Sequence, residues 1–400
     1  MKVLLVNKFL YPNGGSETYI FEIGKKLIEQ GHEVQYFGME HEKRIVGNNT
    51  GSYTSNMDFH TGKLQKLLYP FKILYSIEAR KKIRVVLEDF KPDVVHLNNI
   101  NFQITPSIIY EIRSFEKKNG KKIKIVFTAH DYQWVCPNHM MYIPHTGEIC
   151  ERCLGGKYAN CTKYRCIHGS LVKSALGSIE SWLYHTRKTY GLVDTIICPS
   201  AFMAKQLETD PVLKNKLVVM HNFLTSNTCE QTYEKENYIL YFGRYSKEKG
   251  IETLIKVCKE LSHIPFVFAG NGPLKDEVAA CSNIKDVGFV TGKDLQELIG
   301  KARFSIYPSE WYENCPFSVM ESQMYGTPVI GADIGGIPEL IEEGKTGELF
   351  VSGDVAQLKG KIESLWTDKE RQKSYADNCA GIKFDSIADY CDKLVSVYQN

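Results

Sequence analysis

The sequence has no run of about eighteen apolar residues, so it predicts no membrane-spanning helix. Its N-terminus, from Met1 to Lys8, has too short an apolar stretch for a signal peptide and is better interpreted as a buried first strand. A net charge of only +2 over 400 residues, with ordinary composition, is typical of a globular protein. We therefore expect a cytoplasmic protein with two domains or one large one.

Two familiar binding signatures are also missing. No basic stripe with interleaved aromatic residues is present, which argues against nucleic acid as a partner. The glycine-rich segment after the first strand does not match Gly-x-Gly-x-x-Gly, so a nicotinamide or flavin cofactor is not expected.

Charge is unevenly distributed along the chain. Residues 1–200 hold 27 Lys/Arg and 18 Asp/Glu, a balance of +9, whereas residues 201–400 hold 22 and 29, a balance of −7. A basic first half favours an anionic partner, such as a membrane surface or a phosphorylated acceptor.

Short apolar runs alternate with helical patterns in both halves, which predicts an α/β fold with parallel sheets. The predicted strands are residues 3–6, 33–37, 94–97, 124–128 and 195–199 in the first half and 238–242, 266–269, 284–289, 304–307 and 329–331 in the second. A polar, turn-rich segment separates the halves. We predict two doubly wound domains, residues 1–217 and 218–385, that face a central cleft, and an amphipathic helix within residues 386–400.

The most informative stretch is a loop and a predicted helix in the second half. Pro316 pre-sets a first helical turn and Gly326 ends the helix, so Glu313 lies in the loop and Glu321 about one and a half turns inside the helix. The free amides of the first turn can hold a diphosphate while the carboxylates accept hydrogen bonds from sugar hydroxyls. The pattern therefore points to a nucleotide-sugar.

The context of the two glutamates carries a family resemblance. Glu-x7-Glu follows an apolar strand and precedes Gly-Thr-Pro-Val-Ile and Gly-Gly-Ile-Pro-Glu-Leu, and together they resemble the donor-site signature of the retaining glycosyltransferases of family 4. The resemblance spans nearly the whole chain. It implies the GT-B architecture of two Rossmann-like domains, with the C-terminal helix crossing back to the first domain. It also implies a metal-independent, retaining transferase that moves a sugar from a UDP- or GDP-sugar to an acceptor hydroxyl.

Two cations precede a predicted helix in the second half. Arg244 and Lys249 follow a strand and stand just before a helix that begins near Ile251. A helix N-terminus disfavours positive charge, so the pair makes more sense if an anion lies between the cations and the helix dipole. A solvated basic turn is the plainer alternative. In the resembled family, Arg and Lys at these places bind the diphosphate.

The resemblance also assigns the remaining donor contacts. Glu313 would hold the sugar hydroxyls, Glu321 the ribose, and the amides of the first helical turn the diphosphate. The other donor-binding residues that it implies are Pro316, Phe317, Gly270, Gly272 and Phe289. Taken alone, the glycine pair would indicate only a tight turn, and the stretch at Phe289 only the end of a buried strand.

Two sites in the first half complete the predicted cleft. Gly14 and Gly15 follow the first strand and open a helix, so backbone amides can closely approach a phosphate or substrate. His130 lies just past another strand end. A single histidine is more often structural, but the family carries here a histidine that contacts the donor sugar. We therefore predict functional roles for all three residues.

A cysteine-rich insertion, residues 136–168, is not explained by the resemblance. Cys150-x2-Cys153 followed by Cys161-x4-Cys166 could close a tetrahedral, structural zinc site in a reducing cytosol. The alternative is a set of reduced thiols in a packed loop. Ordinary members of the family lack this cluster.

The acceptor is suggested by residues 63–84, which interleave apolar residues with cations. Such a segment can lie in the headgroup region of an anionic leaflet, although a core-facing helix with a solvated basic side is the alternative. With the basic first half, it suggests a polyprenyl-diphosphate-linked saccharide in polysaccharide assembly, met at the inner face of the cell membrane.

Two other functions stay open. One is a nucleotide-sugar 2-epimerase of the same fold, and the other is a non-catalytic sugar-nucleotide-binding protein. Two departures from the family pattern bear on donor geometry: Asn222-Phe-Leu-Thr replaces Asn-Gly-Val-Asp, and Asn314 stands where glycine is frequent.

Overall fold

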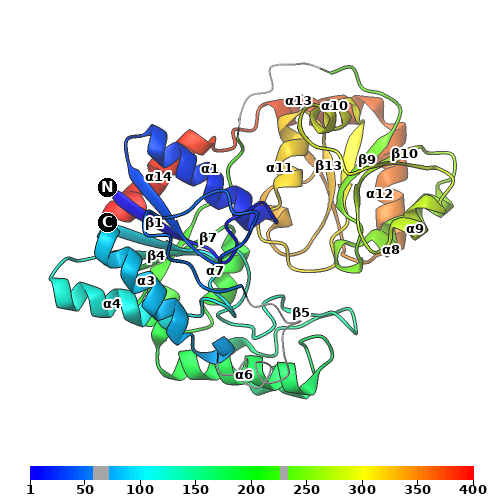
Figure 1. Cartoon of the computed structure of the whole chain (residues 1–400). Helices are drawn as coiled ribbons and strands as arrows, with labels where there is room; N and C mark the ends of the chain where they lie inside the picture. Colours follow the sequence, from blue (N-terminus) through cyan, green and yellow to red (C-terminus); the bar gives the residue numbers. More distant parts are fainter. Residues whose placement is uncertain (57–71, 226–232) are drawn as a thin grey trace.

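The computed structural model describes residues 1–56, 72–225 and 233–400. It contains two six-stranded parallel sheets, with strand orders β2-β1-β3-β4-β7-β8 and β11-β10-β9-β12-β13-β14 (Figure 1). The predicted α/β class with two doubly wound sheets is therefore confirmed. Within the described residues, none of the helices combines the length and the apolar character needed to span a membrane.

The first sheet carries helices on both faces. Its strands are β1 (Lys2–Val6), β2 (Glu33–Phe37), β3 (Val94–Leu97), β4 (Lys124–Thr128), β7 (Thr195–Cys198) and β8 (Leu217–Val219). Its helices include α1 (Gly15–Glu29), α3 (Ile77–Phe90), α4 (Ser107–Asn119) and α7 (Ala201–Leu207). The strands are apolar on both sides because both faces are buried, as expected for a parallel sheet.

The second sheet repeats this scheme. Its strands are β9 (Ile239–Arg244), β10 (Phe266–Asn271), β11 (Ile284–Gly288), β12 (Phe304–Tyr307), β13 (Val329–Ala332) and β14 (Gly347–Phe350). Its helices are α8 (Ile251–Glu260), α9 (Lys275–Ala279), α10 (Gly292–Lys301), α11 (Phe317–Met324), α12 (Val355–Thr367) and α13 (Lys369–Ala380). Strands β8 and β14, at one edge of each sheet, were not predicted, and β8 extends the first sheet past residue 217.

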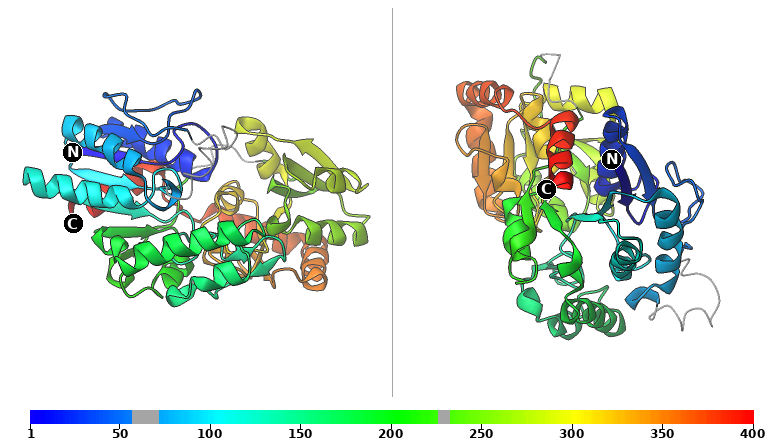
Figure 2. Two further views of the ribbon diagram at one scale, coloured as in Figure 1. Left: turned by 60° about the horizontal axis from the view of Figure 1, so that its bottom comes forward. Right: turned by 90° about the vertical axis from the view of Figure 1, so that its left-hand side faces the viewer.

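The C-terminal helix α14 (Ile387–Gln399) returns to the first sheet. A capping box at Ser386 starts it, and Tyr390 and Tyr398 lie in the same core as α1. The hydroxyl of Tyr390 is 2.9 Å from that of Tyr19, and the hydroxyl of Tyr398 is 2.7 Å from His96 Nδ1. The two chain ends consequently lie near each other in every view (Figures 1 and 2). We propose that residues 386–400 belong to the N-terminal domain, as do Val218 and Val219 of β8, and that the donor domain follows β8 and ends at residue 385.

The cysteine-rich insertion lies between β4 and β7. The predicted insertion, residues 136–168, contains the hairpin β5 (Tyr142–Ile143) and β6 (Glu148–Ile149), followed by α5 (Ala159–Lys163). Helix α6 (Leu171–Thr186) follows it before β7, and from here on the insertion means the whole of residues 136–186. Its small core consists of Ile143, Cys153, Tyr158, Cys161 and Cys166, with Cys150 packed against it.

The predicted zinc site finds no support in this core. In the described part of the chain, no group of three or more His, Cys, Asp or Glu side chains is arranged to hold a metal ion. The thiols are free and pack against apolar and aromatic side chains. The arrangement agrees with the alternative, reduced cysteines that act as small apolar residues.

The predicted membrane segment, residues 63–84, lies partly outside the described residues, which resume at residue 72. Its last part belongs to α3, whose Ile83 is buried in the core of the first sheet. Arg80 and Arg84 form ion pairs with Glu111 of α4. For α3 the structure supports the alternative, a core-facing helix with a polar outer side.

Candidate active site

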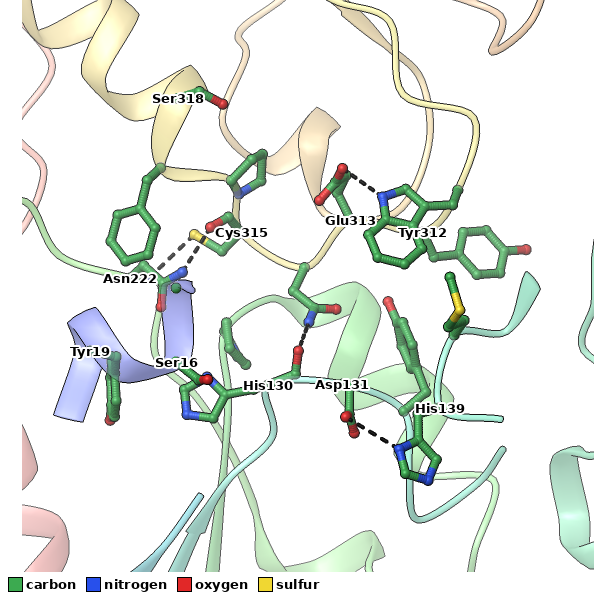
Figure 3. Close-up of a pocket in the computed structure, with 18 of the residues that line it drawn as sticks. Ser16, Tyr19, His130, Asp131, His139, Asn222, Tyr312, Glu313, Cys315 and Ser318 are labelled. Atoms are coloured by element: carbon green, nitrogen blue, oxygen red, sulfur yellow. Dashed lines mark hydrogen bonds and ion pairs between the residues drawn. The ribbon is translucent and has the colours of Figure 1, made fainter. Parts of the chain in front are cut away.

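A cavity of about 590 Å³ lies between the two sheets and is lined from both halves of the chain (Figure 3). It forms where loops follow the carboxyl ends of parallel strands, the usual place for ligands of such folds. The predicted site residues in its lining are Gly15, His130, Lys249, Glu313, Pro316 and Phe317. The structure therefore brings together residues that are up to 302 positions apart in the sequence.

Glu313 and Lys249 form an ion pair in this cavity. Glu313 Oε1 accepts hydrogen bonds from Lys249 Nζ at 2.5 Å, Trp311 Nε1 at 2.6 Å and Ser309 Oγ at 2.9 Å. Glu313 is only 8% exposed. Burial by itself raises the pKa of Glu313, but the ammonium group and the donated hydrogen bonds outweigh it and hold the pKa below its usual value. The pair is therefore fully charged.

Burial also acts on Lys249, where it lowers the pKa. The neighbouring Glu313 carboxylate outweighs this effect, so the net shift is upward. Lys249 lies in a 3₁₀ turn directly before Gly250, whose φ of +72° suits glycine. A Cβ at Gly250 would lie 1.8 Å from the carbonyl oxygen of Pro308. Only glycine allows the turn to approach Pro308, the residue directly after β12, so closely and place the lysine beside Glu313.

The N-terminus of α11 opens into the same cavity. Pro316 is its N-cap and gives no side-chain hydrogen bond to the first turn. Pro316, Phe317 and Ser318 line the cavity, so the first-turn amides are presented to a ligand there.

The Gly335-Gly336 pair holds the loop before α11 in place. The amide of Gly336 donates to the carbonyl oxygen of Glu313 at 2.8 Å. A Cβ at Gly335 would lie 2.4 Å from that same oxygen, and one at Gly336 would lie 1.7 Å from the carbonyl oxygen of Asn314. The glycines thus let two loops pack backbone to backbone and fix the position of Glu313.

His130 forms the opposite wall. Its Nε2 lies 2.8 Å from Asn98 Oδ1, and its ring packs edge to face against Tyr19. Burial lowers the pKa of His130 to about 4, so the imidazole is neutral near pH 7. Because Asn98 presents an oxygen, Nε2 is assigned the proton and Nδ1 the lone pair. Gly15, at the start of α1, has open space where a Cβ would be, while Gly14 precedes it as the N-cap.

Two asparagines at the places where the chain departs from the family pattern join loops that are far apart in the sequence. Asn314 Nδ2 donates to the carbonyl oxygen of His130 at 2.6 Å, and Asn222 Nδ2 donates to that of Cys315 at 2.8 Å. Asn314 Oδ1 and Tyr132 Oη are buried and have no hydrogen-bond partner among the described residues. Buried polar atoms without partners are uncommon, so these two are available to a ligand.

Asp131 and His139 add a polar wall to the cavity. The sequence placed the His130-Asp131 pair at the cleft, but neither Asp131 nor His139 was predicted as a site residue. Asp131 Oδ2 lies 3.6 Å from His139 Nδ1, and Asn101 Nδ2 lies 2.9 Å from the same ring nitrogen. Burial raises the pKa of Asp131, but the effects of His139 and of the amide of Gln133 lower the pKa by more, so the net shift is downward. His139 has a φ of +68°, an uncommon conformation for a side chain of this size that is often found at functional sites. The His-Asp dipeptide at a strand end was the available signal.

A second cavity, of about 620 Å³, lies at the carboxyl ends of β9, β10 and β11. Its lining includes Arg244, Gly270, Gly272 and Phe289, four of the predicted site residues. Phe289 is 79% exposed. A Cβ at Gly270 would lie 1.9 Å from the carbonyl oxygen of Gly243. This cavity has an aromatic face and a cation. It is separate from the cavity that holds Lys249, so the two predicted diphosphate cations line different cavities.

Glu321, the second predicted carboxylate, is half-buried on α11. Burial raises its pKa to about 7. It is absent from the linings of both cavities as the described residues form them. The prediction that it meets a ribose stays untested.

Two family models match the chain, that of glycosyltransferase family 4 over residues 13–226 and that of glycosyl transferases group 1 over residues 228–380. The chain belongs to glycosyltransferase family 4. It is a transferase enzyme, as the resemblance of its loops implied.

Relatives and solved structures agree with this assignment. An uncharacterized 42.6 kDa protein in the cps region of Klebsiella pneumoniae is 24% identical over 359 residues, 85% of this chain and 87% of that protein. N-acetyl-alpha-D-glucosaminyl L-malate synthase of Bacillus anthracis is 22% identical over 97% of this chain and 94% of that protein.

Among solved structures, Anabaena HepE in complex with UDP has a TM-score of 0.68 at 15% identity and covers 100% of both chains. The lipopolysaccharide outer core galactosyltransferase WaaB has a TM-score of 0.65 at 15% identity and covers 100% of this chain and 99% of that one. The fold of this glycosyltransferase is therefore GT-B.

Proposed function

We propose that this glycosyltransferase moves a sugar from a UDP- or GDP-sugar to an acceptor hydroxyl, with retention of the anomeric configuration. The observation that carries the proposal is the Lys249–Glu313 ion pair beside the open N-terminus of α11, within a cavity whose other wall is His130. The cation and the helix amides at this point can bind a diphosphate, and the carboxylate beside them can bind the hydroxyls of an attached sugar.

The donor would span both cavities. Its nucleoside would lie against Phe289 and the turn at Gly270 and Gly272, with Glu321 at the ribose. Its diphosphate would lie between Arg244 and Lys249, at the N-terminus of α11. The structure of HepE with UDP supports a uridine nucleotide as the first donor to test.

The sugar would lie beside Glu313 and His130. Lys249, Ser309 and Trp311 all donate to Oε1 of Glu313, so Oε2 is the oxygen that we assign to a sugar hydroxyl. The neutral His130 can accept a hydrogen bond through Nδ1. Both groups would orient the sugar without reacting with it.

In the reaction, the anomeric C–O bond to the diphosphate breaks and a bond from the acceptor oxygen forms on the same face of the sugar. Negative charge develops on the departing phosphate, where Arg244, Lys249 and the α11 amides would stabilise it without a metal ion. The departing oxygen takes the proton of the acceptor hydroxyl. Asp131 lies on the opposite wall and would align that hydroxyl.

The acceptor that we propose is a lipid-linked saccharide, such as a polyprenyl-diphosphate-linked one, used in cell-surface polysaccharide synthesis. The cps-region relative and the lipopolysaccharide galactosyltransferase support this class, as does the basic first half of the chain. The enzyme would act in the cytoplasm, as a peripheral protein at the inner face of the membrane.

A transfer assay tests the proposal. A panel of UDP- and GDP-sugars is first screened for thermal stabilisation of the protein. The donor found is then incubated with lipid-linked saccharides, with and without EDTA. We expect nucleoside diphosphate release that depends on acceptor, resists EDTA, and gives a product with the donor's anomeric configuration. Formation of a 2-epimer without acceptor would indicate the epimerase, and donor binding without any turnover would indicate a non-catalytic protein.

A further inference from the structure

Helix α6 of the insertion presents four of its large apolar residues to solvent. Leu171 is 53% exposed, Val172 69%, Ile179 50% and Trp182 60%. The buried residues of the same helix are Ser174, Gly177, Ser178, Glu180, Ser181 and Tyr184. The usual arrangement of a surface helix, with apolar residues inward and polar residues outward, is therefore largely reversed.

The buried side of α6 is held by hydrogen bonds and close packing within the insertion. Thr162 Oγ1 donates to Ser178 Oγ at 2.8 Å, and Ser178 Oγ donates to the carbonyl oxygen of Tyr158 at 2.8 Å. The amide of Ile167 donates to Ser174 Oγ at 3.0 Å. A Cβ at Gly177 would lie 2.6 Å from Ile167 Cδ1. This close packing explains the small residues on the buried side of α6. It does not explain the large apolar residues on the exposed side.

The outward residues form one stripe. Val172, Ile179 and Trp182 are spaced by seven and three positions, a spacing that puts side chains on one face of a helix. Figure 1 shows α6 along the lower edge of the molecule, and Figure 2 (left) shows it on the front surface when that edge is turned forward. Nothing in the proposed reaction uses this stripe.

The exposed charge of α6 and of the segment that precedes it has one sign. Residues 157–188 include six cations, Lys157, Lys163, Arg165, Lys173, Arg187 and Lys188, and all of them are exposed. The same range of residues contains one acidic residue, Glu180, which is buried. The apolar stripe of α6 thus has exposed cations near both of its ends, Lys173 in the first turn and Arg187 and Lys188 directly after the last.

We propose that α6 docks this enzyme on an anionic lipid bilayer, with Val172, Ile179 and Trp182 entering the headgroup region and the surrounding lysines and arginines contacting lipid phosphates. An amphipathic helix with tryptophan and basic flanks is suited to this boundary. A second copy of the chain is a poorer occupant, because a symmetric contact would bring the same cations together. The inference deepens the proposed function by naming the surface that would meet the lipid of a lipid-linked acceptor.

The docked insertion would also bring the cleft close to the membrane. Tyr312, next to Glu313, donates its hydroxyl to Glu151 of the insertion at 2.7 Å. The ring of Tyr312 also packs against those of Tyr132 and Phe202. The insertion that carries α6 is therefore in direct contact with the loop that holds the donor-site carboxylate.

The experiment measures sedimentation of the full chain with vesicles of phosphatidylcholine, with and without phosphatidylglycerol. We expect binding that needs the anionic lipid and fades with added salt. Replacing Val172, Ile179 and Trp182 with serine should weaken it by at least about tenfold. Reversing Lys173, Arg187 and Lys188 to glutamate should weaken it by roughly a hundredfold.

Matched controls are available in the donor domain. Val351→Ser removes another exposed apolar residue, and Lys256→Glu, Lys259→Glu and Lys275→Glu together reverse three exposed lysines. Neither control should change binding beyond about twofold. Equal binding of the α6 variants and the wild type, or no binding of the wild type at low salt, would overturn the proposal.

Tryptophan fluorescence tests whether the stripe is free before docking. The difference between wild type and Trp182→Phe reports Trp182 alone. We expect quenching by acrylamide in buffer, and protection with a blue shift on anionic vesicles. Protection already present in buffer would show that the chain itself or a second copy covers the stripe, and the proposal would fall.

Transfer to a water-soluble acceptor analogue separates this inference from the proposed function. The α6 variants should transfer sugar to it like the wild type, since the replaced side chains are exposed on the outer side of α6 or directly after it and none of them lines the cavity. If the wild type binds vesicles but neither it nor the variants transfer sugar, the proposed function is refuted and the docking proposal stands. If the wild type transfers sugar but does not bind vesicles, the docking proposal is refuted and the proposed function stands.

Discussion

Asn314 Nδ2 of the loop before α11 donates a hydrogen bond of 2.6 Å to the carbonyl oxygen of His130, so the two walls of the cleft are joined at the residues on either side of the proposed sugar site. Asn314 directly follows Glu313, and His130 directly precedes Asp131. A change at this one contact should therefore affect the donor and the acceptor sides together.

Asn314→Ala should raise KM for the donor and lower kcat/KM by roughly fivefold to tenfold, because one interdomain hydrogen bond is worth about 1 kcal/mol. The protein should stay folded. A matched control is Asn378→Ala, which removes a 3.0 Å hydrogen bond to the carbonyl oxygen of Lys345 within the donor domain. Steady-state kinetics measure KM and kcat for both variants. Equal losses of kcat/KM in the two would show that the hydrogen bond of Asn314 to His130 has no specific effect on catalysis.

Lys249→Ala and Arg244→Ala should each lower kcat by at least about a hundredfold through lost stabilisation of the departing diphosphate. Their stabilities should differ. Lys249→Ala leaves Glu313 as a buried carboxylate without its cation, a loss that costs about 3–5 kcal/mol in typical cases. Arg244 is exposed, so its replacement should leave unfolding unchanged.

Urea denaturation and kinetics check this pair of variants together. The double variant Lys249→Met, Glu313→Gln should recover much of the lost stability, because no buried charge remains, but none of the activity. An active double variant would refute the assignment of the pair to the donor site. Near-normal turnover in Arg244→Ala would remove that residue from the diphosphate site.

The fold was largely predictable because both faces of each sheet are buried. Residues 33–37, 94–97, 124–128 and 304–307 are apolar runs whose predicted bounds equal those of β2, β3, β4 and β12. The edge strand β8 was missed because it is short and its Val218 and Val219 are partly exposed, so little in its pattern separates it from a loop.

The candidate site was predictable where a motif carried it. Glu313, Lys249 and His130 were predicted from strand ends and helix starts together with the family resemblance, and the structure brings them to one cavity. His139 was missed because its position depends on its own backbone conformation, with a φ of +68°, and no local sequence pattern predicts that conformation. The separation of Arg244 from Lys249 was also unforeseen, because sequence spacing does not say which cavity a side chain enters.

Glu321 should make nucleotide affinity depend on pH. Burial raises its pKa to about 7 in the free protein, and a ribose hydroxyl would bind its ionised form better. Affinity for the free nucleotide should therefore rise as pH rises through about 7 and then level off. Glu321→Gln should bind more weakly and lose this dependence, whereas Glu313→Gln should keep it. Calorimetry at several pH values measures both, and a flat profile in the wild type would refute the ribose assignment.

Asp131→Asn should separate the acceptor from the donor. The carboxylate lies on the wall opposite α11, and its lowered pKa keeps it ionised to accept a hydrogen bond from an acceptor hydroxyl. The amide should lower kcat for transfer by roughly a hundredfold, within the range of a lost proton-handling or orienting group.

The comparison that gives Asp131 a specific role is between transfer and donor binding in the same variant. Nucleotide affinity and slow donor hydrolysis should stay within about twofold of the wild type, since neither needs the acceptor hydroxyl. The exposed Asp276→Asn in the donor domain is the matched control and should transfer normally. If Asp131→Asn loses nucleotide affinity in step with transfer, the residue supports the donor site or the fold, and the acceptor hydroxyl must be aligned by another group on that wall.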